Sequence, residues 1–225
     1  MLTTPHLHNW RTELSEECQQ ALADCLTYKT LRKGDFLHSI GEEALVCYQV
    51  EQGKVKIGNH NKDGREIIHG MMHQGDCFGE LTMVLGNRRN TYALAHTDAE
   101  VNLLHQKHYI DLSYRYPELS LALNKFFSAR LQYLSNNYEA ALLETLYERL
   151  GNTILRQVIS GGLTDENGKL YLPDISQEML GQMVGATRQG IGRELKKMEK
   201  IGLVHIHYGK IYINDIEYFT KLFGL

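Results

Sequence analysis

Arginine and glutamine side chains gather at the start of one short helical segment near the end of the chain. Arg188, Gln189 and Arg193 lie within six residues, and helical spacing brings them to one face near an N-terminus. Arginine can donate two hydrogen bonds to guanine O6 and N7, and glutamine can pair with two atoms of adenine. The three side chains therefore predict contact with base edges in a DNA major groove.

The residues around this trio are typical of a helix-turn-helix. Ser176 is a suitable N-cap for a first helix over 177–183. Gly185 permits a sharp turn after it. Thr187 is a suitable cap for the second helix, and Gly202 is expected to end it as a left-handed glycine. We expect this second helix to be the one that enters the groove.

The second helix also has an apolar face and a set of lysines. Ile191, Leu195 and Met198 share one side and are expected to be buried. The chain carries a net charge of −3, but phosphate binding needs only a local positive face. The expected DNA contacts are Ser176, Thr187, Arg188, Gln189, Arg193, Lys196 and Lys197, with Lys200 further back. Residues 204–213 alternate around a glycine and predict a wing hairpin. The alternative is a helical pair with solvated lysines.

The segments that precede the helix-turn-helix must position it, and they show two kinds of sequence pattern. Residues 28 to about 108 consist of short strand-like runs separated by Gly-Asp and Asp-Gly turns, which predicts a sandwich or roll. From Pro117 to about Ser160 the apolar period becomes helical.

An a/d seam on this long helix predicts association with a second copy of the chain. Its positions are Phe127, Leu131, Leu134, Tyr138, Ala141 and Thr145. A neighbouring stripe of Leu142, Leu146 and Leu150 is expected to pack on the chain's own domain. A long helix buried within one chain remains the alternative.

Two segments carry a resemblance to a known family. Residues 75–81 read Gly-Asp-Cys-Phe-Gly-Glu-Leu, and residues 88–93 read Arg-Arg-Asn-Thr-Tyr-Ala. Together they look like the phosphate-binding cassette of cyclic-nucleotide-binding domains. With the helix-turn-helix over 175–203 in the expected order, the chain resembles the Crp/Fnr family of bacterial regulators over nearly its whole length.

The resemblance implies roles for particular residues. The cassette glycine, Gly79, would offer a backbone N–H; Glu80 would accept from a ribose 2′-hydroxyl, and Arg89 would pair with a cyclic phosphate. The full expected effector set is Gly79, Glu80, Leu81, Arg89, Asn90 and Ser135. The alternative is that Glu80 and Arg89 form a structural ion pair.

The chain departs from the family's cyclic-AMP sensors at two places. Asn90 follows the cassette arginine, where the family has a small hydroxyl residue or alanine. Leu134 and Ser135 stand where those sensors have threonine and serine near the purine, which leaves the base open.

The cysteines and histidines are the residues that could carry another sensing chemistry. Cys18, Cys25, Cys47 and Cys77 form no CxxC pair and are expected to be packed or surface thiols, with redox or metal sensing as the alternative. An iron–sulfur sensor would show a tighter cysteine cluster, and a haem sensor could use His73 or Cys77. His69, His96, His105 and His108 show no metal spacing.

The sequence thus predicts an α+β chain that is not an enzyme, with no catalytic or metal residues. We expect a jelly-roll-like antiparallel β-roll over 1–116, a dimerisation helix over 117–150 and a winged helix-turn-helix over 151–225. The expected partners are a near-palindromic double-stranded DNA site, RNA polymerase and a second copy of the chain. The expected effector is cAMP or a related cyclic nucleotide.

No secretory signal or membrane span is expected, which favours a cytoplasmic location. Two alternatives stay open. One is a sensor that uses redox or haem chemistry, or none. The other is a cyclic-nucleotide-binding regulatory subunit.

Overall fold

The computed structural model describes residues 9–224, so the expectations for Met1 to His8 lie outside it. Its internal contacts divide the chain into two units: a sensor unit that ends at Leu134, and a second unit that begins at Ser135. The mixture of antiparallel sheets and helices confirms the predicted α+β class. Within the described residues, no helix is both long enough and apolar enough to cross a bilayer.

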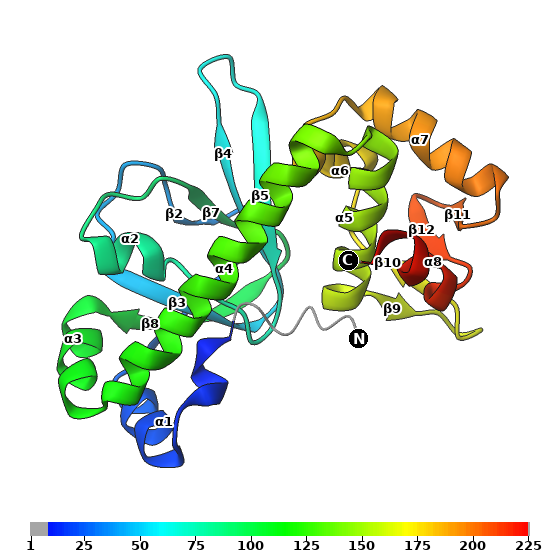
Figure 1. The fold of residues 1–225 in the computed structure, drawn as a ribbon. Coiled ribbons are helices and arrows are strands. Elements are labelled where there is room, and N and C mark those ends of the chain that lie inside the picture. Colours follow the sequence, from blue (N-terminus) through cyan, green and yellow to red (C-terminus); the bar gives the residue numbers. More distant parts are fainter. Residues whose placement is uncertain (1–8, 225) are drawn as a thin grey trace. The chain divides into compact units, whose positions relative to one another are not determined.

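Two four-stranded antiparallel sheets form the roll of the sensor unit (Figure 1). The first has the order β1-β8-β3-β6 and the second the order β2-β7-β4-β5. The strands are β1 Thr27–Leu31, β2 Phe36–His38, β3 Val46–Gln52, β4 Val55–His60, β5 Glu66–Met72, β6 Cys77–Phe78, β7 Tyr92–Ala95 and β8 Ala99–His105. Their inward side chains, among them Val50, Val55 and Phe78, form one apolar cluster between the sheets.

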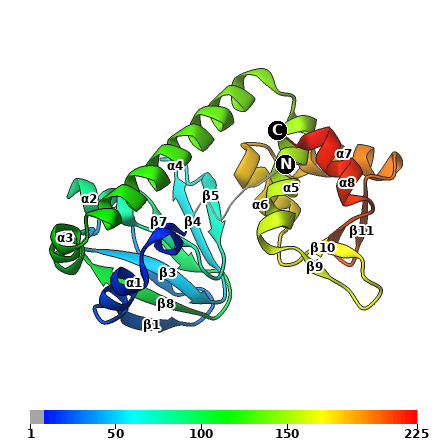
Figure 2. The ribbon, with the colours of Figure 1, turned by 60° about the horizontal axis from the view of Figure 1, so that its bottom comes forward.

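Helices cover the outside of the first sheet and form a second apolar cluster with it (Figure 2). They are η1 Trp10–Glu13, α1 Glu16–Ala23, α3 Gln106–Arg115 and the first part of α4 Pro117–Leu143. A short helix, α2 Glu80–Leu85, follows β6. The cluster includes Trp10, Leu22, Leu112 and Leu119. The start of α4 is thereby fixed to the roll.

The long helix ends earlier than the sequence predicted. We expected it to continue to residue 150, but α4 stops at Leu143 and a separate helix, α5 Leu146–Gly161, begins after it. Thr145 is the N-cap of α5 and forms a reciprocal capping box with Glu148. Thr145 therefore does not belong to the seam, and Leu150 is fully buried in the second unit.

The second unit contains the predicted helix-turn-helix and wing around its own core. Its further elements are β9 Leu163–Thr164, β10 Leu170–Leu172, α6 Gln177–Val184, α7 Arg188–Lys200, β11 Val204–His207, β12 Lys210–Ile213 and α8 Ile216–Phe223. The strands form one antiparallel sheet of order β11-β12-β10-β9. Leu180, Ile191, Leu195 and Phe219 are fully buried in the core that holds α5 to α8 together.

Candidate functional site

Helix caps fix the geometry of the helix-turn-helix as predicted. The hydroxyl of Ser176 accepts from the backbone N–H of Met179 at 3.1 Å, and that of Thr187 accepts from Gly190 at 3.1 Å. Gly185 takes a left-handed conformation with φ 73° at the turn, and Gly202 takes φ 76° after α7. Each supplies a backbone conformation that a side chain would strain.

The predicted base-reading residues are exposed together at the start of α7. Arg188, Gln189 and Arg193 are exposed, whereas Ile191 and Leu195 of the same helix are fully buried. Packing therefore holds the helix by its apolar face and leaves the polar face to solvent. This is the arrangement that entry into a major groove requires.

The lysines behind this trio are not equivalent. Lys196 and Lys200 are exposed. The Nζ of Lys197 instead lies 2.8 Å from a carboxylate oxygen of Glu194, one turn earlier on the same helix. The ion pair shields part of the Lys197 charge, so Lys196 is better placed to contact a phosphate.

The wing ends in a tight turn. Tyr208 and Gly209, between β11 and β12, both have positive φ, 45° and 76°, which is the backbone of a type I′ hairpin turn. Tyr208 is 93% exposed at its tip. The hairpin places an aromatic ring and the neighbouring Lys210 on the surface of the second unit.

In the sensor unit, the cassette glutamate is buried and ion-paired. Glu80 is 1% exposed, and its Oε1 accepts from Arg130 of α4 at 2.9 Å. Its Oε2 has no hydrogen-bond partner. Burial raises the pKa of Glu80, and the positive charge of Arg130 opposes that shift. One carboxylate oxygen is thus left for another donor.

Arg89, the cassette arginine, donates to neutral carbonyl and hydroxyl oxygens rather than to the carboxylate of Glu80. Its Nη1 donates to the carbonyl of Gly79 at 2.9 Å and to the hydroxyl of Thr82 at 3.1 Å. Its Nη2 donates to the carbonyl of Val46 and to the hydroxyl of Tyr48. The structural ion pair considered between Glu80 and Arg89 is therefore wrong, because Glu80 pairs with Arg130.

Gly79 is required where β6 meets α2. It has φ 85°, and a Cβ there would lie 2.9 Å from the Nη1 of Arg89 and 3.1 Å from the ring of Tyr48. A side chain would therefore both strain the backbone and displace the guanidinium. The close approach keeps the cassette backbone against Arg89.

Unpartnered polar atoms show that this cluster suits a polar ligand. Three buried side chains, Glu80, Arg89 and His38, have atoms without a hydrogen-bond partner: Oε2, Nε and both ring nitrogens. Buried polar groups are usually paired, so each such atom calls for an explanation. A carboxylate oxygen can accept from a ribose hydroxyl, and Nε–H can donate to a phosphate. The residues present thus fit a cyclic nucleotide.

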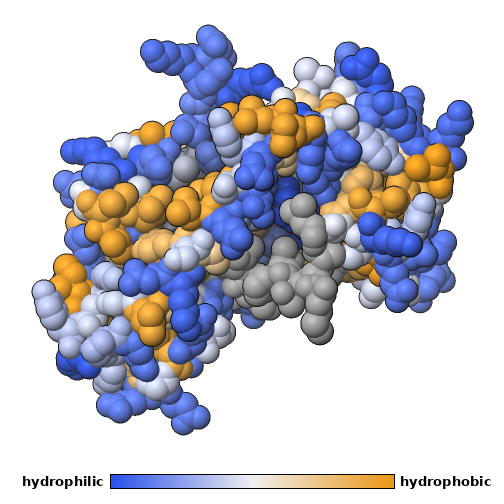
Figure 3. Space-filling model, viewed as in Figure 1, coloured by the Kyte–Doolittle hydropathy of each residue, from blue (hydrophilic) through white to orange (hydrophobic). Residues whose placement is uncertain are grey.

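Exposed leucines line α4 beyond its base in the roll. Leu131 is 70% exposed, Leu134 60% and Tyr138 68%. Leu142, from the second predicted stripe, is also exposed. Hydrophobic residues follow this helix across the surface in Figure 3. Exposed apolar stripes of this kind mark interaction surfaces.

Comparison with known proteins matches both halves of the chain. Residues 28–114 match the model of the cyclic nucleotide-binding domain, and residues 148–222 match the Crp-like helix-turn-helix domain. The cAMP-activated global transcriptional regulator CRP of Haemophilus influenzae is 27% identical over 192 residues, which cover 83% of each chain. The Crp/Fnr resemblance is thereby confirmed. The chain belongs to the Crp/Fnr family of transcription regulators.

Solved structures show the same fold. FixK2 of Bradyrhizobium japonicum aligns with a TM-score of 0.77 at 20% identity, covering 89% of this chain and 98% of that one. The c-di-GMP responsive global regulator CLP of Xanthomonas campestris aligns with a TM-score of 0.76 at 19% identity, covering 89% and 100%. Like other Crp/Fnr proteins, the chain joins a cyclic nucleotide-binding domain to a DNA-binding helix-turn-helix.

The remaining residues of the predicted effector set are exposed. Leu81 is 50% exposed on α2, and Asn90 is exposed with its carbonyl accepting from Asn59. Ser135 is exposed on α4, at the first position of the second unit. Their contacts with an effector stay predictions.

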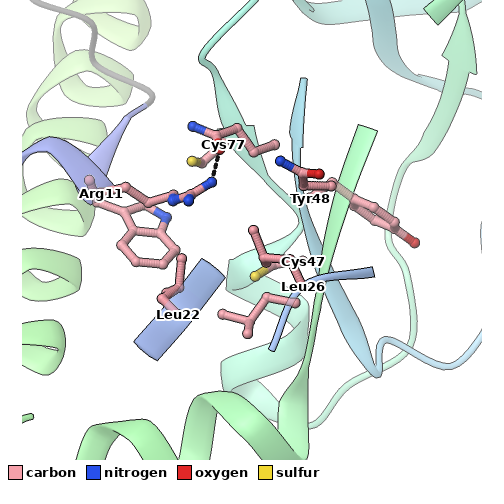
Figure 4. A pocket seen from close by; sticks show the side chains of 10 residues that line it. Arg11, Leu22, Leu26, Cys47, Tyr48 and Cys77 are labelled. Carbon is pink, nitrogen blue, oxygen red and sulfur yellow. Dashed lines mark hydrogen bonds between the residues drawn. The ribbon is translucent and has the colours of Figure 1, made fainter. Parts of the chain in front are cut away.

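The cysteines gather on the helix-covered side of the first sheet. Cys18, Cys47 and Cys77 are buried in the cluster formed with α1 and α4, and Cys25 packs against it. Cys47 and Cys77 line a small pocket that is partly open to solvent, and Figure 4 shows their sulfur atoms facing it. Burial raises the pKa of the Cys18 thiol to about 11 and those of Cys47 and Cys77 further. Such thiols are protonated at neutral pH and react slowly.

The histidines and cysteines of residues 9–224 do not form a metal site. There, no three histidine, cysteine or carboxylate side chains converge as metal ligands. His73, considered as a haem ligand, is partly buried, and burial lowers its pKa to about 4, as do the nearby positive charges of Lys54 and His96.

Sequence reasoning missed three residues of the site. Arg130, Tyr48 and His38 all contact or face the cassette residues, although 50, 41 and 51 positions separate them from Glu80 or Arg89. A polar residue at a buried position would have marked these residues. A single sequence does not show which polar residues are buried and which lie on the surface.

Removing Arg130 tests the ion pair. In Arg130→Gln, buried Glu80 loses its cation, and its folded pKa rises further above the unfolded value. A raised carboxyl pKa makes the folded state less stable as pH rises through it. We expect Arg130→Gln to lower the free energy of unfolding by about 2 kcal/mol at pH 8 and by less at pH 5. This is less than for a fully buried pair, because the Arg130 side chain is one-third exposed.

Urea unfolding at both pH values, followed by the fluorescence of Trp10, measures this loss, because Trp10 is the chain's single tryptophan and lies in the sensor unit. The double variant Glu80→Gln/Arg130→Gln is the control and should show no such pH dependence. An equal loss at pH 5 and pH 8 for Arg130→Gln alone would contradict the assignment.

Proposed function

We propose that this transcription regulator acts as a homodimer whose DNA affinity is set by a cyclic nucleotide bound in the roll. The observation that supports it best is the pairing of two sites. One is a buried cluster at Glu80 and Arg89 that has unused polar atoms. The other is an exposed trio of base-reading side chains on a capped helix.

The DNA contact is proposed to be made by α7. Arg188, Gln189 and Arg193 would reach base edges, while Lys196 and the capping hydroxyls of Ser176 and Thr187 would contact phosphates. Two copies related by a twofold axis would place their α7 helices about 34 Å apart on a near-palindromic site. RNA polymerase is proposed as the protein partner of the DNA-bound form.

The effector is proposed to be cAMP or a related cyclic nucleotide. Glu80 would accept from its ribose, and Arg89 would receive its phosphate. Both Nη atoms of Arg89 already donate to carbonyl and hydroxyl oxygens of the sensor unit. The phosphate would therefore bind Nε–H or replace a weak contact, such as the 3.3 Å bond to Tyr48. CRP of Haemophilus influenzae is described as cAMP-activated, which supports this class of ligand.

Coupling between the effector and α4 is proposed to run through Glu80. One carboxylate oxygen is free for the ligand and the other already binds Arg130 on α4. Ligand binding at Glu80 would therefore change the charge environment of a residue on the seam helix. An effector needs only about 1–3 kcal/mol of preference for one state to be useful.

The partner copy is proposed to cover the exposed side of α4. Leu131, Leu134 and Tyr138 recur at alternating steps of three and four, the spacing at which two helices interdigitate. Burying these side chains against an identical helix would remove apolar surface that a lone chain exposes to water.

Base recognition can be tested on a selected DNA fragment. We expect Arg188→Ala and Arg193→Ala to weaken binding about 10- to 100-fold, since each removes about 1–3 kcal/mol of base contact. Fluorescence anisotropy at fixed salt measures this. Lys62→Ala, which removes an exposed cation from the β4–β5 hairpin, is the control and should bind as wild type.

Site selection with Gln189→Glu should change the preferred half-site, because glutamate only accepts hydrogen bonds. Wild-type affinity that is equal for selected and scrambled DNA would refute sequence-specific binding.

The effector assignment is tested by ligand-induced stabilisation. We expect saturating cAMP to raise the Tm of the wild type and to leave that of Arg89→Gln nearly unchanged, because a ligand stabilises only the state that binds it. Arg88→Gln is the matched control, since the adjacent Arg88 is exposed and donates outside the cluster to Gly41. Equal shifts in both variants would exclude Arg89 as the phosphate contact.

DNA affinity measured with and without cAMP completes the effector test. If the two affinities are equal, cAMP is not the effector, and the DNA-binding proposal stands. A regulatory subunit without a DNA role would show no salt-sensitive DNA binding at all.

The seam is tested by introducing charge. We expect Leu131→Lys/Leu134→Lys to sediment as a monomer at concentrations where the wild type is a dimer, because four lysines would face one another across the interface. Tyr114→Lys is the control: Tyr114 is 85% exposed on α3, away from the seam. A double variant that remains dimeric in analytical ultracentrifugation would place the interface elsewhere.

A further inference from the structure

His38 is turned into the interior of the roll by an irregularity in β2. In β2 and β7, Phe36 pairs with Leu94 and His38 pairs with Ala93, so Leu37 is an extra residue between the two pairs. Successive residues of a regular strand face opposite sides. Here Leu37 and His38 are both buried, at 8% and 4% exposed. Such bulges re-aim side chains and are common beside functional sites.

The imidazole lies against the side chains that hold Arg89. Its ring stacks on that of Tyr48 at 5.5 Å between centroids, with 21° between the planes. The Arg89 guanidinium lies 5.2 Å from the centre of the same Tyr48 ring and is bonded to its hydroxyl. His38 thus belongs to the surroundings of the cassette arginine, although it comes from the other sheet of the roll.

Both ring nitrogens of His38 are buried and neither makes a hydrogen bond of regular geometry, although the Thr91 backbone lies close enough to interact with the ring. An unpartnered buried polar group destabilises the fold. If His38 served only for packing, leucine could take its place without loss of stability. Burial and the positive charge of Arg89 lower the pKa of His38 to about 3, against a small opposing effect of the Thr91 backbone. The neutral ring therefore offers one N–H donor and one acceptor.

We propose that His38 is a third polar contact of the effector site, donating its N–H to a phosphate-bearing ligand held at Arg89. This inference rests on the proposal that the roll binds such an effector, and it adds a residue that determines ligand affinity. A neutral donor beside a permanent cation binds an anion without adding a second buried charge. That would suit a singly charged phosphodiester better than a doubly charged phosphomonoester.

Two substitutions separate a ligand contact from a packing role. His38→Leu keeps similar bulk and removes both polar atoms, whereas His38→Gln keeps an N–H donor. His73→Leu is the matched control, because His73 is also a partly buried histidine with a lowered pKa, but the charges that act on it are those of Lys54 and His96 rather than Arg89. Each full-length variant is titrated with cAMP, cGMP, cyclic di-GMP and inorganic phosphate, and Tm and calorimetric affinity are recorded.

We expect His38→Leu without ligand to melt at or above the wild-type temperature, since it loses an unpartnered polar group. Its affinity for the nucleotide that binds wild type should fall at least tenfold. His38→Gln should fall less, and His73→Leu should bind as wild type. Inorganic phosphate should bind more weakly than any bound cyclic nucleotide.

The outcomes distinguish this inference from the proposed function. If a cyclic nucleotide binds wild type and His38→Leu with equal affinity, the role of His38 is refuted and the effector proposal stands. If cAMP fails but another probe binds in a His38-dependent way, cAMP is refuted and His38 is supported. If no probe binds the wild type, both the role of His38 and the effector proposal are refuted. Should His38→Leu fail to fold, undiminished affinity in His38→Phe, which keeps a flat ring but has no donor, would refute the contact.

Discussion

A buried guanidinium needs hydrogen-bond acceptors around it, and Arg89 imposes that requirement on the sensor unit. At 3% exposure it cannot rely on water, and an unsatisfied buried charge would destabilise the roll by several kcal/mol. The acceptors come from β3, from the Gly79 carbonyl and from α2. Meeting this one requirement therefore fixes the cassette against the first sheet, and it explains why Gly79 must lack a side chain.

Glu80 extends the same network to α4. Its carboxylate is as deeply buried as Arg89, but its cation comes from a helix that leaves the roll. The two cassette charges are thus satisfied in different ways: Arg89 by neutral acceptors of its own surroundings, and Glu80 by a partly exposed arginine. The second arrangement is the more easily changed, because the Arg130 side chain has access to water that can replace its partner.

Much of this architecture could be predicted from the sequence because the signals are local. Ser176, Thr187 and Gly185 act within three or four residues of themselves, so their roles follow from type and spacing. The predicted end of α4 was wrong, although Thr145 and Glu148 form a local capping box. The apolar repeat continues from α4 into α5 and hides the break between the two helices. Arg130, Tyr48 and His38 could not be predicted, since their contacts depend on how two sheets and a helix close over one another. The burial of His38 depends in addition on a bulge that the residues of β2 do not signal.

The ion pair between Glu194 and Lys197 has a consequence for the kind of selectivity that α7 can have. A lysine already held by a carboxylate would gain less from a phosphate, because its contact with Glu194 is lost when the contact with the phosphate forms. Glu194 also repels the backbone of any DNA, whatever its sequence. The helix therefore gives up part of its general attraction for nucleic acid, and what remains depends more on the bases. A regulator built in this way would spend less time on random chromosomal DNA.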